Sequence, residues 1–155
     1  MGTFRYLTPT GAPVPPADPG ELVRAFYERI WNAGDLSAVP ALLSPDFRFR
    51  GSLGNELVGW DAFREYVRSV REPLAGYRCE ILECVTDSGR AFAKMRFSGT
   101  HVAPFRGFEP TGNPVEWMGA ALFHCTDGVI SELWVLGDLA GLDALLHRNQ
   151  HGRTP

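Results

Sequence analysis

Two titratable side chains lie at the ends of predicted secondary-structure elements, and each could transfer a proton. His101 ends a predicted strand and precedes a segment that Pro and Gly interrupt. A histidine at such a strand end could reach a ligand and exchange a proton, because its ordinary pKa is near ~6.5. The alternative is a structural role in which the imidazole bonds a carbonyl of the following loop.

Asp138 is the second proton-transfer candidate. It directly precedes leucines at helical spacing, Leu139, Leu142, Leu145 and Leu146, which is the position of a helix N-cap. In apolar surroundings its pKa would rise, and the carboxyl group could then act as a general acid or base. Capping and proton transfer are compatible roles.

Arg50 closes a short predicted strand and is a candidate for binding an oxygen of a substrate. A fixed guanidinium could hold an enolate or carboxylate, whereas the simpler interpretation is a surface arginine. With the two-residue alternation of a strand, Arg48 and Arg50 share one face and Phe47 and Phe49 share the other. The pattern predicts that the face with the arginines is exposed to solvent.

Large rings are abundant in this small chain and could stack on a planar ligand or simply form its core. The ring-bearing candidates are Tyr27, Trp31, Trp60, Phe63, Tyr66, Trp117 and Trp134. Alternation also places Val115, Trp117, Gly119, Ala121 and Phe123 on one strand face. Small residues beside rings on that face would leave room for a ligand.

Three helices are expected to precede the strands. Asp18, Pro19 and Glu21 predict the start of a first helix, which ends at Gly34. Asp35 predicts the start of a short second helix, and a third is expected from about Trp60 to Arg71, where Pro73 stops it.

Four long strands are expected after Gly76, over residues 77–86, 90–101, 114–125 and 129–137. Turns at Asp87-Ser88-Gly89 and Asp127-Gly128 make them antiparallel, and a short extra strand is expected at Phe47–Gly51. Residues 102–113 form a predicted lid. Helices followed by an antiparallel sheet indicate an α+β fold.

Length, composition and charge limit the class of protein. The chain has 155 residues, of which 45% are hydrophobic and 21% charged, which predicts one folded domain over residues 19–148 between a proline-rich arm (1–18) and a tail (149–155). A net charge of −3 argues against nucleic acid as a partner. The sequence predicts no membrane span, and we expect a cytoplasmic protein.

Metal and disulfide chemistry are not indicated. The three cysteines, Cys79, Cys84 and Cys125, contain no CxxC pair. The four histidines lack metal-ligand spacing, so no metal is expected.

Several segments resemble the SnoaL-like polyketide cyclases (ester cyclases) of the nuclear transport factor 2-like superfamily. These are Arg96 to His101, Pro104 to Gly107, Pro110 to Gly112, Gly119 to Phe123, Asp127 to Ile130, Glu132 to Trp134 and Asp138-Leu139. With the helical opening at Phe26-Tyr27-Glu28 and Trp31 to Gly34, the resemblance spans about residues 20–147. It implies a cone of helices on a strongly curved, mostly antiparallel sheet, a deep apolar pocket and a homodimer.

The resemblance also implies a reaction and its residues. Members of the family close a ring on a polyketide ester by an intramolecular aldol reaction without a cofactor, and they read His-Trp-Asp in the last strand. This chain has Leu133-Trp134-Val135 there, which removes the specific basis for that reaction. Leu133 and Val135 are then inward residues of the pocket, while His101 and Asp138 are the remaining matches that could transfer protons.

The leading hypothesis is therefore a cofactor-free cyclase or isomerase for a small, largely apolar, polyketide-like substrate. Holding one folded conformer can itself contribute several kcal/mol, and about 7 to 11 in favourable intramolecular reactions. The alternatives are a non-catalytic small-molecule binding protein, an epoxide hydrolase or epoxide-opening cyclase of the same fold, and a structural dimerisation domain.

Overall fold

A computed structural model describes residues 18–152 of the chain, so the predicted arm lies outside the described residues except for Asp18. The helical elements are α1 (Pro19–Ala25), the π-helical η1 (Phe26–Asn32), the 3₁₀ turn η2 (Leu36–Ala38), α2 (Val39–Leu42), α3 (Trp60–Arg71) and α4 (Leu139–His151). The strands are β1 (Leu43–Arg50), β2 (Glu56–Val58), β3 (Leu74–Asp87), β4 (Arg90–His101), β5 (Pro114–Thr126) and β6 (Val129–Gly137).

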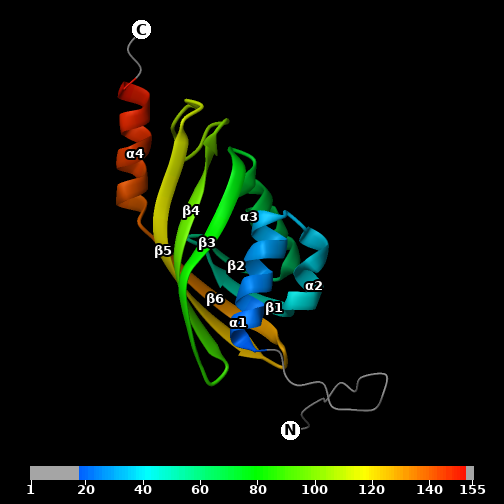
Figure 1. The fold of residues 1–155 in the computed structure, drawn as a ribbon. Coiled ribbons are helices and arrows are strands. Elements are labelled where there is room, and N and C mark those ends of the chain that lie inside the picture. Colours follow the sequence, from blue (N-terminus) through cyan, green and yellow to red (C-terminus); the bar gives the residue numbers. More distant parts are fainter. Residues whose placement is uncertain (1–17, 153–155) are drawn as a thin grey trace.

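The strands form one curled but unclosed mixed sheet in the order β2-β1-β6-β5-β4-β3. The neighbouring pairs within β3, β4, β5 and β6 are antiparallel, as predicted, whereas β1 runs parallel to β6. Figure 1 shows α1, α2 and α3 together on one side, with α4 standing apart beside β5. The predicted α+β class, with helices packed on a curved sheet, is confirmed.

Local turn and cap chemistry explains why the elements begin and end where they do. Asp18 caps α1 by accepting a hydrogen bond from the Glu21 amide at 3.3 Å.

In the β3–β4 hairpin Ser88 and Gly89 both have positive φ, 48° and 79°. Two successive left-handed residues make the tight turn that matches the twist of paired strands. The predicted hairpin is confirmed.

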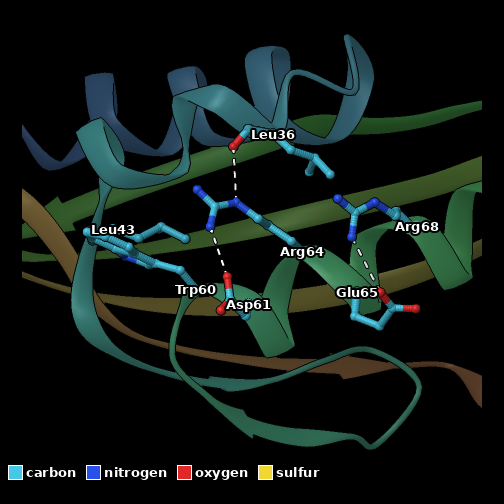
Figure 2. Close-up of polar contacts among 7 residues, drawn as sticks. All are labelled: Leu36, Leu43, Trp60, Asp61, Arg64, Glu65 and Arg68. Carbon is cyan, nitrogen blue, oxygen red and sulfur yellow. Dashed lines mark hydrogen bonds and ion pairs between the residues drawn. The ribbon is translucent and has the colours of Figure 1, made fainter.

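Helix α3 has the predicted bounds, and two of its half-buried side chains fix it to the preceding segment (Figure 2). The Trp60 indole N–H donates to the Leu43 carbonyl at 3.1 Å. Arg64 donates to the Leu36 carbonyl at 3.5 Å and pairs with Asp61 at 3.2 Å. The contacts of Trp60 and Arg64 with the two carbonyls hold α3 against η2 and the start of β1, whereas the pair with Asp61 lies within the helix.

Two strands begin earlier than the sequence-based expectation. Strand β1 begins at Leu43, before the predicted start at Phe47, and β3 begins at Leu74, before the predicted start at residue 77. The short edge strand β2 has no counterpart among the predicted elements. No helix within residues 18–152 has the length and apolarity needed to cross a membrane.

Candidate functional site

An internal cavity lies between the curved sheet and the N-terminal helices. Its lining is formed by Phe26, Tyr27, Trp31, Phe49, Ser52, Tyr66, Tyr77, Cys79, Phe97, Leu133 and Val135. The volume is only about 20 Å³, which is room for about one water molecule. The deep pocket that the resemblance implies is therefore nearly closed in this structure, because rings occupy most of the space.

Five of the predicted substrate-binding residues line this cavity: Tyr27, Trp31, Tyr66, Leu133 and Val135. The positions that carry His and Asp in the family motif thus do face the interior, with aliphatic side chains in this chain. Sequence reasoning missed Tyr77, Cys79 and Phe97 on β3 and β4. Their alternation with exposed residues could have indicated the inward face.

Four further candidates are buried in the core without lining the cavity: Phe63, Trp117, Ala121 and Phe123. Phe63 packs on Phe26 with ring centroids 5.7 Å apart, and Trp117 packs on Phe97 at 5.3 Å. Trp60 is half-buried at the start of α3, where its indole N–H donates to the Leu43 carbonyl. The contacts of these residues support a role in the core.

Arg50 lies on the outer face of the sheet, opposite the cavity. Its guanidinium donates to the Val135 carbonyl and stands 5.8 Å from the ring of Trp134. Phe47 and Phe49 are buried on the inner face, as the alternation predicts. With Arg48, Glu56, Glu132 and neighbouring residues, Arg50 lines an outer groove of about 280 Å³. It therefore cannot contact a ligand inside the cavity.

His101 is completely buried at the end of β4, on the same face as Phe97. Neither ring nitrogen has a hydrogen-bond partner, so the imidazole does not bond a loop carbonyl. The loop closes through the backbone instead, since Gly112 N–H donates to the His101 carbonyl at 2.9 Å. The Phe105 ring lies 6.3 Å from the imidazole and 6.1 Å from the Trp117 ring.

Asp138 is exposed and caps α4. Its carboxylate accepts from the Gly141 amide at 2.9 Å, which is the expected capping contact. Its own N–H donates to Met118, and Met118 faces Arg96, five residues before His101. At about 3.4 Å per residue, that places Asp138 roughly 17 Å along the sheet from His101. The two candidate proton-transfer residues are not brought together.

The polar groups around the cavity are hydroxyls and a thiol that stay protonated. Burial, with the nearby Cys79 thiol as a smaller cause, raises the pKa of Tyr27 well above its ordinary value. Burial likewise raises the pKa of Tyr66, that of Tyr77 strongly, and that of Cys79 to about 12. Neutral hydroxyls donate hydrogen bonds and make poor bases. The cavity can therefore stabilise an oxygen better than it can remove a proton.

Residues 51–55 form a closing loop between the cavity and the end of β6. The loop is held by a hydrogen bond from Gly51 N–H to the Asn55 carbonyl at 2.8 Å. A Cβ on Gly51 would lie 2.4 Å from the Tyr66 hydroxyl, and one on Gly137 would lie 2.8 Å from the Ser52 carbonyl oxygen. Glycine at both positions lets the loop pack directly on the cavity wall.

Metal ligands do not gather at this site. Within residues 18–152, no group of three or more His, Cys, Asp or Glu side chains could hold an ion. The cavity lining, moreover, has only one thiol and no histidine or carboxylate.

The curved sheet under three helices, with a ring-lined interior, defines the class of small α+β proteins with nuclear transport factor 2-like architecture. The family model for SnoaL-like polyketide cyclases matches residues 21–146. The chain belongs to that family, as the sequence resemblance indicates, and this membership supports a cyclase-type role. No match was found among curated proteins.

Solved structures share the fold. IdmH from Streptomyces antibioticus is 22% identical with a TM-score of 0.75, covering 84% of this chain and 99% of that one. TsrD from Streptomyces laurentii is 24% identical, with a TM-score of 0.71 and coverage of 82% and 92%. A SnoaL-like polyketide cyclase from Agrobacterium tumefaciens is 16% identical, with a TM-score of 0.71 and coverage of 82% and 96%.

Proposed function

We propose that the protein is a cofactor-free cyclase or isomerase for a small, largely apolar, polyketide-like substrate. The observation that carries this proposal is the ring-lined interior under the curved sheet, with aliphatic residues and hydroxyl groups as its only other lining apart from one thiol. Such a lining favours a folded, planar ligand and fixes its orientation with few hydrogen bonds. Positioning then supplies most of the rate enhancement.

Substrate entry requires the cavity to open, since its present volume admits only about one water molecule. The closing loop is the segment that we propose moves. Ser52 lines the cavity, and the hydroxyl of Tyr66 interacts electrostatically with the Ser52 side chain and the Leu53 backbone. Movement of this loop would open the space next to Leu133 and Val135 without disturbing the strands. The sheet would remain a rigid frame for the ligand.

For proton transfer we propose His101, with Asp138 as the second candidate. The burial of His101 and its two unpartnered nitrogens support a role in which the imidazole exchanges a proton with a ligand. His101, Phe105 and Trp117 are all absent from the cavity lining, so a ligand reaches His101 only if packed rings move. The exposure of Asp138 and its bond to Gly141 support capping, so its proton-transfer role rests on the family match.

A second candidate function is ligand binding without turnover. It is favoured by one observation, namely that no carboxylate or imidazole lines the cavity. A protein of this kind would sequester or present an apolar molecule. The enzyme and the carrier share the cavity and differ only in what His101 and Asp138 do.

The test uses a tricyclic anthraquinone ester that carries a β-keto side chain. Aldol closure joins the enolate carbon to a carbonyl carbon and moves the α-proton to the new alkoxide, so the mass is unchanged. Chromatography with mass detection should find an isomer of altered retention, formed more slowly by His101→Ala and Asp138→Asn. Binding of the ester without isomer formation would support the carrier. If the ester neither binds nor reacts, the cavity proposal fails for this substrate class.

We also propose a cytoplasmic homodimer. The outer sheet face exposes Phe92, Trp134 and Leu136 at 44%, 43% and 50%, and Leu122 lies between Phe92 and Trp134 in register. An apolar patch on paired strands is the kind of surface that a second copy covers. The free thiols fit a reducing compartment. Analytical ultracentrifugation of wild type and Leu136→Glu tests the dimer, which the variant should weaken.

A further inference from the structure

Tyr27 carries a buried hydroxyl that bonds to nothing. The side chain is 3% exposed and lines the internal cavity, yet its oxygen has no hydrogen-bond partner. Burying a hydroxyl without a partner costs roughly 1–3 kcal/mol, so such groups are rare and call for an explanation. A ligand that accepts the hydrogen bond would provide one.

The other two tyrosines of the cavity differ from Tyr27. The Tyr66 hydroxyl interacts electrostatically with Ser52 and the Leu53 backbone of the closing loop, and the Tyr77 hydroxyl with the Cys79 thiol. Among the three tyrosines that line the cavity, Tyr27 is the one whose hydroxyl oxygen is fully buried without a hydrogen-bond partner.

The position of Tyr27 is fixed by its surroundings. Its ring meets Phe26 and Phe123 edge-on, with centroids 5.0 and 5.8 Å away. It also lies on η1, where the backbone follows a π-helix, a rare form that is frequent at functional sites. A donor held by packing needs no reorganisation when a charge develops in front of it.

We infer that the Tyr27 hydroxyl donates a hydrogen bond to a carbonyl or enolate oxygen of the ligand, and that the site selects cyclic ketones over hydrocarbons of the same shape. This inference rests on the proposed function, because it requires the cavity to admit a ligand. The raised pKa of Tyr27 supports it, since the group remains a donor at neutral pH. The same bond would stabilise the negative oxygen of an enolate formed during cyclisation.

The probes are 1-tetralone and tetralin, two bicyclic molecules of similar shape of which only the first has a carbonyl oxygen. Their dissociation constants are measured by calorimetry for wild type, Tyr27→Phe and the control Ser44→Ala, which removes a buried unpartnered hydroxyl outside the cavity. Wild type should bind the ketone about tenfold more tightly than the hydrocarbon, the difference expected for one buried hydrogen bond. Tyr27→Phe should abolish this preference, and Ser44→Ala should keep it.

The infrared carbonyl stretch of bound 1-tetralone gives a second readout that needs no variant to fold. It should lie lower in wild type than in hexane, and return toward the hexane value in Tyr27→Phe. An unshifted stretch in wild type, or an equal preference in wild type and Tyr27→Phe, overturns the inference but leaves the cavity proposal intact. If neither probe binds wild type, the cavity proposal fails, and the inference fails with it.

Discussion

Arg106 and Asp143 form a two-bond ion pair that ties the 102–113 loop to α4. The Arg106 Nε and Nη2 atoms donate to the two carboxylate oxygens at 2.6 and 2.9 Å. Arg106 adopts a left-handed φ of 51° at the loop tip, next to Gly107. The segment that the sequence indicates as a lid is thus fastened, in this structure, to the C-terminal helix.

Replacing Arg106 by Met should loosen this loop more than it destabilises the fold. The pair is partly exposed, with 22% and 44% of the two side chains accessible, so solvent limits its contribution to under about 1 kcal/mol. Hydrogen exchange should increase across residues 102–113 while the amides of β4 stay protected. Unchanged exchange in the loop would mean that the ion pair does not restrain it.

The contribution of the ion pair should depend on pH with a defined sign. The hydrogen bond from Arg106 lowers the pKa of Asp143 below its ordinary value. The pair therefore stabilises the folded state above the unfolded-state pKa, near ~3.9, and this contribution is lost as the pH falls through the lower folded-state pKa.

Denaturation of wild type and Arg106→Met at several pH values measures the effect. Their difference in unfolding free energy should be full at pH 6, shrink as the pH falls below the ordinary carboxyl pKa, and vanish once Asp143 is protonated in the folded state. A difference that stays constant over this range would assign the effect of the variant to packing of the arginine stem.

The sequence predicted those parts of the fold that local chemistry decides. Helix α3 and the two-residue turns follow from residues within a few positions of each other, such as Pro73 after α3 or Asp127 before Gly128. The parallel pairing of β1 with β6 joins residues more than eighty positions apart. No local signal encodes that partner, and the three-residue β2 is too short to produce a pattern.

Part of the cavity lining could be predicted from the sequence, whereas the shape of the cavity could not. Alternation and the family match placed Leu133 and Val135 inward, and the structure has them on the cavity wall. Whether rings such as Trp117 surround a hollow or fill it depends on rotamers and on sheet curvature, which residue types do not specify. The lack of a hydrogen-bond partner for the Tyr27 hydroxyl is likewise a consequence of packing.

Replacing Gly137 by Ala should displace the closing loop. The new Cβ would lie 2.8 Å from the Ser52 carbonyl oxygen, which is backbone and cannot rotate away. Such overpacking costs about 1–3 kcal/mol. Amide exchange at Ser52 and Leu53 should increase, and apolar probes should bind faster. Leu136→Ala, on the outer face, is the control and should leave the loop protected. Equal exchange in both variants would show that the loop does not rest on Gly137.

Two substitutions at Asp138 separate helix capping from proton transfer. Alanine removes both roles, whereas asparagine removes only proton transfer. Asp138→Ala deletes the acceptor for the Gly141 amide and should lower the unfolding free energy by about 1 kcal/mol. Asp138→Asn keeps an oxygen at that position, since asparagine caps helices about as well as aspartate, but its amide cannot accept or release a proton near neutral pH.

Chemical denaturation and the isomer assay described above, applied to both variants, therefore distinguish three outcomes. Loss of stability in the Ala variant with full turnover in the Asn variant assigns Asp138 to the cap of α4 alone. If the Asn variant keeps its stability but loses turnover, Asp138 has a proton-transfer role as well. Wild-type stability in the Ala variant would contradict the cap, and Asp18→Ala at the start of α1 serves as the reference for what loss of a cap costs in this chain.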